Sequence, residues 1–247
     1  MHLPKLFVGS AAFLLLAAAP GFSQTSSAAK PKTSTTHTAA TYDHALLKPA
    51  LLKATAPASY QVKFDTTRGE FTVTVNRAWA PMGADRFYNL VKHHYYDGAR
   101  LYRVIPSFVA QFGINANPVV NTAWTNATIK DDPVTQKNVR GTLTFAKTAN
   151  PNSRTTEIFI NLKDNTFLDS QGFAPFATVD GSGMNVVEMF YDQYPDPAGA
   201  NEQPKMEKGG EKYIASKFPK LDTIKSATIV GAAEPATKSA SSAKPKS

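Results

Sequence analysis

The stretch YDGARLYRVIPSFVAQFG, residues 96–113, decides the fold of this chain. It holds two strand-like runs, 101–105 and 108–112, separated by a Pro-Ser pair. Short apolar runs bounded by Gly and Pro are typical of β-strands joined by a tight connection. The stretch therefore predicts two short strands, the first of which carries a single arginine, Arg103.

Strand patterns continue on both sides of this stretch. Apolar residues alternate with polar ones at 60–64 and again at 71–75, with Thr-Arg-Gly between the two runs, so we expect a β-hairpin there. Further strand-like runs lie at 141–146, 158–162, 174–179 and 223–230.

Two helices are predicted among these strands. In residues 80–94, Phe87, Leu90 and Val91 share one helical face, and Pro81 suits the first turn. A second, shorter helix is expected at 185–191. Many short strands, two helices and connections rich in Gly, Pro and Asn indicate an antiparallel barrel closed at its ends by helices.

The first 23 residues have the pattern of a secretory signal peptide. A basic start at Lys5 precedes an almost wholly apolar run at 6–19, and Ser23–Gln24 is a small-residue cleavage point. The run is short for a bilayer span, although an uncleaved membrane anchor remains the alternative. We expect an exported protein, periplasmic or secreted, with no stable membrane insertion once the signal is removed.

Low-complexity segments flank the expected globular domain at 60–231. Residues 24–59 form a linker or arm, whose part 42–59 carries two Leu-Leu pairs and is either a short apolar arm docked on the domain or a partly ordered linker. The segment 232–247 is predicted to be a disordered tail. The segment 192–212 is rich in Pro, Gly, Glu and Lys and predicts a long exposed loop.

Composition and charge limit the classes of function that this chain can have. A chain of 247 residues with 42% hydrophobic residues is long enough for one substantial packed domain. The net charge is +8, but residues 1–59 contribute +4 and residues 232–247 contribute +2, which leaves +2 for the rest. Because the excess lies in the two ends, the charge argues against a nucleic-acid-binding face. The chain has no cysteine, so core burial has to hold the fold together.

Four ordered blocks resemble the cyclophilin family of peptidyl-prolyl cis-trans isomerases. The first is the stretch quoted above, and the others are RGTLTFAKT followed by PNS at 140–153, TEIFINL at 156–162, and FLD leading to FAPF at 167–176. The resemblance covers about residues 60–230. It implies a mainly β fold, a closed eight-stranded antiparallel barrel capped by two helices, acting as a monomer without metal or cofactor on proline-containing polypeptides.

The resemblance also assigns roles to individual residues. Arg103 would donate a hydrogen bond to the twisting X–Pro amide, helped by Gln111 and Phe108 as the other catalytic positions. The substrate-binding positions implied by the resemblance are Val109, Ala146, Lys147, Thr148, Phe159, Phe167, Leu168 and Phe173.

This chain departs from the familiar family pattern at several positions. Tyr102 stands where His is often found, Phe112 where Gly is, Glu157 where Gln is and Lys147 where Asn is. Phe167 replaces a Trp associated with tight cyclosporin binding, so weak cyclosporin binding is expected because the indole N–H donor is lost. Glu157 brings a negative charge near Arg103, which predicts lowered but not abolished activity.

Simpler interpretations stay open for the same residues. Arg103 could be a surface ion-pair partner, Phe108 and Phe159 could be plain core, and Gln111 could satisfy a buried backbone group. The pair His93–His94 points to a helix-end or solvated role and not to a metal, because adjacent residues face different directions. As a whole, the domain could also be a proline-segment binding module or chaperone with little turnover.

Overall fold

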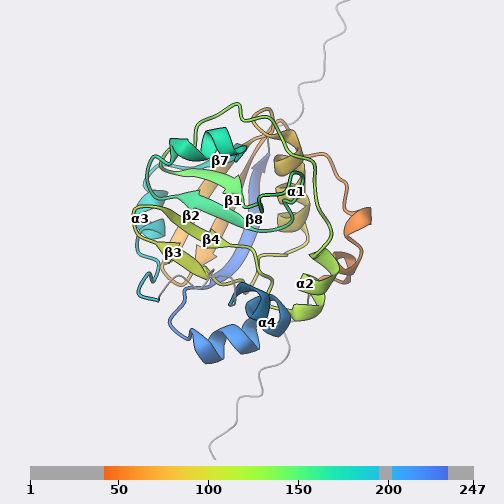
Figure 1. Cartoon of the computed structure of the whole chain (residues 1–247), viewed down its shortest axis with the longest axis vertical. Helices are drawn as coiled ribbons and strands as arrows, with labels where there is room; N and C mark the ends of the chain where they lie inside the picture. The colour runs from red at the N-terminus through yellow and green to blue at the C-terminus, as the bar shows by residue number, and fades with distance from the viewer. Residues whose placement is uncertain (1–41, 195–201, 233–247) are drawn as a thin grey trace, which may run out of the picture. The chain divides into compact units, whose positions relative to one another are not determined.

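The computed structural model describes residues 42–194 and 202–232. Eight β-strands, four α-helices and three short 3-10 helices make up these residues (Figure 1). The strands are β1 (Ser59–Thr66), β2 (Gly69–Asn76), β3 (Arg103–Ile105), β4 (Val109–Phe112), β5 (Thr142–Phe145), β6 (Ile158–Asn161), β7 (Pro175–Val179) and β8 (Ile224–Ala232). The helices are η1 (His44–Leu47), η2 (Pro49–Leu51), α1 (Pro81–Lys92), α2 (Pro118–Trp124), η3 (Thr166–Gln171), α3 (Gly183–Val187) and α4 (Gln203–Lys217). The predicted signal peptide at 1–23 lies outside the described residues.

One antiparallel sheet joins all eight strands in the order β3-β4-β6-β5-β7-β2-β1-β8. The expected closed barrel is wrong, because β3 and β8 end this order and share no ladder in the described residues, which leaves a half-barrel. The chain before β3 meets the start of β8 at an isolated bridge between Arg100 and Thr223 and through neighbouring backbone hydrogen bonds, such as that from the Gly98 N–H to the Ile224 carbonyl at 2.8 Å. Continued in the same antiparallel register, that bridge would pair β3 with residues 218–220, which form the turn after α4 and therefore supply no strand.

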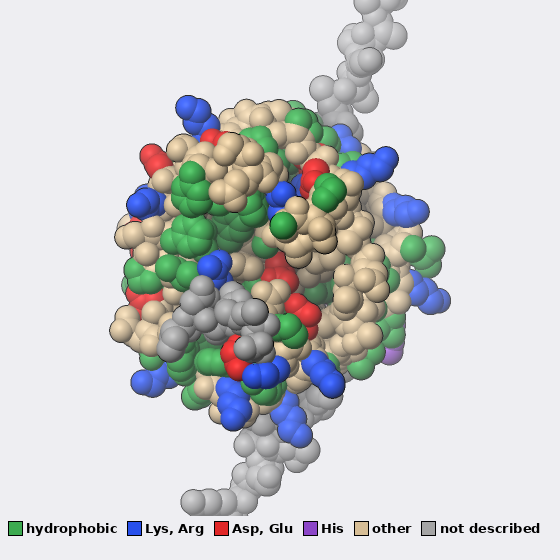
Figure 2. Space-filling view, viewed as in Figure 1, with side chains coloured by type: hydrophobic (Ala, Val, Ile, Leu, Met, Phe, Trp, Pro, Cys, Tyr) green, Lys and Arg blue, Asp and Glu red, His purple; other side chains and the backbone are tan. Residues whose placement is uncertain are grey.

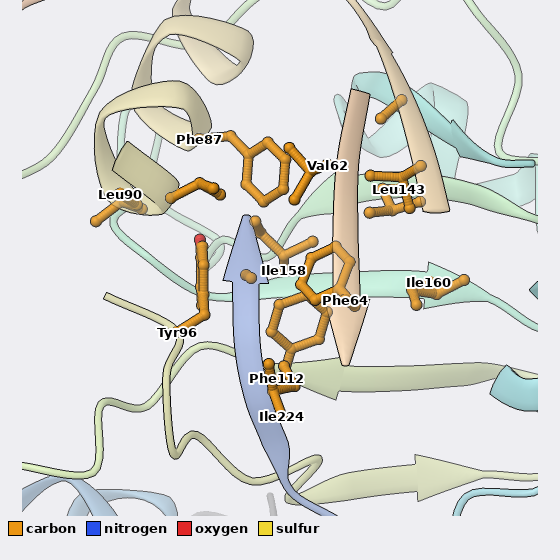
Figure 3. Close-up of a cluster of buried hydrophobic side chains, with 14 of the residues drawn as sticks. Val62, Phe64, Phe87, Leu90, Tyr96, Phe112, Leu143, Ile158, Ile160 and Ile224 are labelled. Carbon is orange, nitrogen blue, oxygen red and sulfur yellow. The ribbon is translucent and has the colours of Figure 1, made fainter. Parts of the chain in front are cut away.

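The core lies on the concave side of this sheet and follows the predicted alternation. Val62 and Phe64 of β1 and Phe71 of β2 point inward and are buried. The Phe64 and Phe71 rings stack with centroids 4.9 Å apart. Phe112 of β4 meets Phe64 edge-on, with ring centroids 5.8 Å apart, and Figure 3 shows these two side chains together in the core. Because residues two apart share a face, the hairpin pattern alone is enough to assign these side chains to the core.

Helix packing agrees with the prediction in part. Helix α1 begins with Pro81, buries Phe87, Leu90 and Val91, and contacts β7 and β8. Helix α3 begins two residues before the start of the predicted 185–191 segment and ends four residues before the end of that segment, and it packs on β2. Helix α2 was not predicted, and it contacts η1 and α4, away from the sheet.

The arm at 42–58 docks on the domain. Leu46 of η1 is fully buried, and its carbonyl accepts a hydrogen bond of 2.8 Å from Trp124 Nε1. Further along, Asn89 of α1 exchanges two hydrogen bonds with the backbone of Ala54. Of the two alternatives for this segment, the structure therefore shows the docked arm.

The segment predicted as a long exposed loop at 192–212 is partly helical, and that prediction is wrong for residues 203–212. These residues begin α4, which is kinked at Gly210 and buries Met206 and Ile214 against Tyr102. Met206, Gly210 and Ile214 recur every fourth residue, a helical spacing that the Pro- and Gly-rich composition obscures. Among the described residues, none of the helices has both the length and the apolar character to cross a membrane.

Candidate functional site

Strand register brings the three central predicted residues together. Arg103 of β3 lies directly opposite Gln111 of β4, and Gln111 lies opposite Phe159 of β6. Opposed residues of an antiparallel ladder share one face of the sheet, so these side chains form a row across three strands. Arg103 Nη1 donates a hydrogen bond of 3.2 Å to Gln111 Oε1.

A cavity of about 290 Å³ opens beside this row. Its floor is a small hydrophobic cluster of Val109, Phe159 and Leu168, all buried, with Phe108 and Phe173 packed against it. The Phe159 and Phe173 rings meet edge-on with centroids 5.8 Å apart. The cavity is lined by Arg103, Phe108, Val109, Gln111, Ala146, Lys147, Phe159, Leu168, Phe173 and Gln203.

Hydrophobic side chains gather at the surface over the region of β3 and β4 (Figure 2). Two cations stand over aromatic rings that line the cavity: the Arg103 guanidinium lies 5.7 Å from the Phe108 ring centroid, and Lys147 Nζ lies 5.4 Å from that of Phe173. The site therefore combines an apolar pocket with positive charge at its rim, which suits a polypeptide with a small apolar ring and polar carbonyl groups.

Two predicted substrate-binding residues lie outside the cavity lining. Thr148 is exposed in the irregular segment after β5, where its backbone N–H donates to Ser153 Oγ at 3.0 Å. The Phe167 side chain is 55% exposed and stacks on the outer side of Phe108, with ring centroids 6.2 Å apart. The structure thus places Phe167 at the rim, as a support for Phe108, and does not bring Thr148 into the pocket.

A glutamate network lies behind the Arg103–Gln111 pair. We use this name for Glu157, Tyr102, Gln111 and Gln203. The Glu157 carboxylate accepts hydrogen bonds from Gln111 Nε2 at 3.0 Å, from Gln203 Nε2 at 2.7 Å and from the Tyr102 hydroxyl. Burial raises the pKa of Glu157 to about 7, and the nearby Glu207 carboxylate raises it as well, while the hydrogen bonds from Tyr102, Gln111 and Gln203 lower it.

Sequence reasoning missed two parts of the site. Gln203 lines the cavity from α4. In the sequence, the only pattern that indicates this helix is the four-residue spacing of Met206, Gly210 and Ile214. The second part is an asparagine network under the pocket, made of Asn138, Asn161 and Asn165, all fully buried.

The asparagine network holds two walls of the pocket through their backbone. Asn165 Nδ2 donates to the Phe108 carbonyl at 2.9 Å, and Asn138 Nδ2 donates to the Phe173 carbonyl at 2.9 Å. Asn165 Nδ2 also donates to Asn161 Oδ1 at 2.8 Å, which ties the two together. Isolated Asn residues carry no sequence pattern, so only the fold reveals this arrangement.

The histidine pair lies at the carboxyl end of α1. His93 Nδ1 is 2.6 Å from Asp43 Oδ2, and His94 Nδ1 is 3.1 Å from Asp97 Oδ2. Each histidine thus has its own acidic partner. Within 42–194 and 202–232, no group of three or more His, Cys, Asp or Glu side chains could hold a metal ion.

The sheet and the site define a mainly antiparallel β protein with a peptide-sized apolar pocket beside one arginine. Residues 61–217 match the family described as cyclophilin type peptidyl-prolyl cis-trans isomerase/CLD, and the chain belongs to this family. Its activity class is therefore peptidyl-prolyl cis-trans isomerase.

Curated relatives carry the same activity in their names. The chain is 37% identical over 143 residues to a peptidyl-prolyl cis-trans isomerase of Acinetobacter baylyi, which covers 56% of this chain and 75% of the relative. It is 33% identical over 135 residues to peptidyl-prolyl cis-trans isomerase B of Escherichia coli, covering 51% of this chain and 81% of the relative.

Solved structures show the same fold. A cyclophilin type peptidyl-prolyl cis-trans isomerase of Cryptosporidium parvum aligns with a TM-score of 0.51 and 19% identity, over 70% of this chain and 98% of the other. The cyclophilin AquaCyp293 from Hirschia baltica aligns with a TM-score of 0.53 and 15% identity, over 72% and 76% of the two chains.

Proposed function

We propose that this isomerase acts on X–Pro bonds of exported polypeptides and that Arg103 is its catalytic hydrogen-bond donor. The observation that carries the catalytic part is the row Arg103–Gln111–Phe159, which sets a cationic donor beside an apolar floor. The experiment that tests it compares isomerisation rates with and without the Arg103 side chain.

To catalyse this reaction, the protein mainly has to position the substrate and a hydrogen-bond donor. Rotation about an X–Pro bond crosses a barrier of about 18–20 kcal/mol because resonance gives the C–N bond partial double-bond character. No covalent bond breaks, so the catalyst has to hold the ring and stabilise the twisted amide more than the planar one.

The pocket floor of Val109, Phe159 and Leu168 would hold the proline ring still. The guanidinium of Arg103 would donate to the prolyl nitrogen, whose lone pair becomes localised as the amide twists. Gln111 would keep that guanidinium in place through its 3.2 Å hydrogen bond. One solved structure of the Cryptosporidium parvum isomerase was obtained in the presence of the dipeptide Ala-Pro, which supports a proline-containing ligand for this pocket.

Lys147 and Phe167 are assigned to the rim. Lys147 would meet peptide carbonyl groups beside the Phe173 ring, and Phe167 would support Phe108 from outside. Without an indole N–H at position 167, weak cyclosporin binding follows.

Arg103→Ala tests the catalytic assignment. We expect the rate of cis-to-trans conversion of a short X–Pro peptide to fall about 100-fold, the size of effect seen when one preorganised donor is removed. Arg140→Ala is the matched control, because Arg140 forms an exposed ion pair with Glu188 and should leave the rate unchanged. Retained peptide binding without acceleration in the wild type would instead make the domain a proline-binding module.

Export is the second part of the proposal, and the signal-like pattern of residues 1–23 supports it. We expect the full chain, expressed in a Gram-negative host, to appear outside the cytoplasm with a new N-terminus near Gln24. Leu15→Arg should retain the uncut precursor in the cytoplasm by breaking the apolar run. An uncut wild-type chain in the soluble cytoplasmic fraction would contradict export.

A further inference from the structure

The glutamate network determines which way the Gln111 amide points. An ionised carboxylate can only accept hydrogen bonds, so the group that faces Glu157 Oε2 has to be the Gln111 NH₂ group, 3.0 Å away. The Gln111 amide is planar, and its carbonyl oxygen therefore turns to the opposite side. That oxygen is the acceptor for Arg103 Nη1.

The amide orientation has no freedom to reverse while Glu157 is ionised. The Gln111 side chain is 7% exposed, so a reversed amide would find little water to replace its lost partners. Reversal would place the NH₂ group against the Arg103 guanidinium, which has donors only, and the carbonyl oxygen against the carboxylate. Both hydrogen bonds would be lost and both contacts would be repulsive.

Helix α4 supplies the remaining donor of the network. Gln203 Nε2 donates to Glu157 Oε1 at 2.7 Å and to Glu207 Oε1 of the same helix at 3.2 Å. The helix is anchored by buried Met206 and Ile214, and by the Glu211 backbone N–H, which donates to the Ala116 carbonyl at 2.8 Å. Gln203 therefore links a docked helix to the catalytic row.

We propose that Glu157 is a positioning residue of this isomerase, which in its ionised form orients Gln111 to hold Arg103, with Gln203 of α4 completing the arrangement. This inference rests on the proposed role of Arg103. It gives the glutamate a supporting function, whereas the sequence suggested only a negative charge that lowers activity.

Protonation of Glu157 would undo the arrangement. A neutral carboxyl group carries one O–H donor that needs an acceptor, and the reversed Gln111 carbonyl can provide it, at the expense of the Arg103 hydrogen bond. The titratable and charged groups facing Glu157 are Tyr102, Tyr95, Glu207 and, through Gln111, Arg103. With its pKa raised to about 7 by burial and by Glu207, Glu157 titrates in the neutral range.

The test is the pH profile of kcat/KM between about pH 5.5 and pH 8.5, measured with an X–Pro peptide that has no titratable side chain. In the wild type we expect a rise of about fivefold with increasing pH, the factor for one hydrogen bond. Glu157→Gln cannot ionise but keeps an acceptor oxygen, so it should remain active with a flat profile. Glu188→Gln, an exposed carboxylate, is the matched control and should keep the wild-type profile.

A second variant tests the helix α4 part without touching the carboxylate. Gln203→Ala removes a hydrogen bond that lowers the pKa of Glu157, so the midpoint of the profile should move to higher pH. An unchanged midpoint would overturn the role of Gln203. A profile in Glu157→Gln identical to the wild type would overturn the role of Glu157, even if Arg103→Ala is inactive. Full activity of Arg103→Ala would instead overturn the proposed function itself.

Discussion

The glutamate network and the asparagine network border the same pocket but are built differently. The first surrounds a carboxylate and draws its donors from β4, from the chain before β3 and from distant α4. The second consists of amides and hydroxyls from residues 138–165, with Asp169 at its edge. One holds the catalytic row through a titratable group, whereas the other holds the pocket walls through neutral amides.

This difference determines which part of the site is sensitive to pH. Neutral amides keep their donors and acceptors at every accessible pH, so the pocket walls stay in place. A partly buried carboxylate changes from acceptor to donor when it takes up a proton, so the catalytic row responds to pH through Glu157. The predictions below test this contrast, beginning with the largest effect.

The largest expected effect is on stability. The pKa of Glu157 is raised from 4.5 to about 7 in the folded state, so the native protein binds this proton more tightly than the unfolded chain. The free energy of unfolding should therefore fall as pH rises from about 4.5 and level off above about 7. Each pKa unit corresponds to about 1.4 kcal/mol, and solvent contact of the residue reduces the sum to about 2–3 kcal/mol.

The measurement is denaturant unfolding of the wild type and Glu157→Gln at several pH values. Other groups titrate as well, and the lowered pKa of Asp43, caused first by its hydrogen bond with His93, acts in the opposite sense at low pH. The difference between the two proteins isolates Glu157, and it should favour the variant progressively from pH 5 to pH 8. A constant difference would show that Glu157 does not titrate in this range.

Asn165→Ala should cost about 2 kcal/mol of stability, because it leaves Asn161 Oδ1 without that donor and loosens the Phe108 carbonyl. We expect KM to rise more than kcat falls, since the pocket wall shifts while Arg103 stays. The loss should be the same at pH 6 and pH 8, as measured by denaturant unfolding. Asn126→Ala, at an exposed position, serves as the control.

Gly210→Ala should cost about 1.5 kcal/mol and damage only the glutamate network. Gly210 has φ +56°, and a Cβ there would lie 2.4 Å from the Ala116 carbonyl oxygen that receives the Glu211 N–H. Gly181→Ala is a matched control, with φ +48° and open space around the new Cβ. A shifted pH profile in Gly210→Ala but not in Gly181→Ala would separate the docking of α4 from backbone strain.

Phe167→Trp should have the smallest effect on the protein. Phe167 lies at the rim of the pocket, next to Phe108, whose carbonyl is held by the asparagine network. The added indole N–H can donate one hydrogen bond, worth about 1 kcal/mol, so cyclosporin affinity should rise about fivefold. Calorimetric titration of both proteins measures this directly. Because Phe167 lies outside the cavity lining, turnover of a short X–Pro peptide should remain as in the wild type.

Much of the fold and of the pocket follows from local pattern. The β1–β2 hairpin and the inward side chains Phe64 and Phe71 were predicted from period-two alternation, because a strand allows a side chain only two directions. The nine predicted residues that line the cavity follow from the four family-like blocks. Arg103 and Gln111 meet because the hairpin pairs them directly, with seven residues between them.

Tertiary structure alone decided the remainder. Whether the sheet closes depends on residues 218–220, which form a turn after α4 where β3 would need a partner strand. Whether 203–217 is a loop or a docked helix depends on a surface for Met206 and Ile214 to cover. The family-like blocks name Glu157, but its function depends on neighbours 46 or more residues away, such as Gln203 and Tyr102. Charge, donor count and burial are properties of the assembled site, because a carboxylate changes its pKa only when the fold removes its water and supplies its partners.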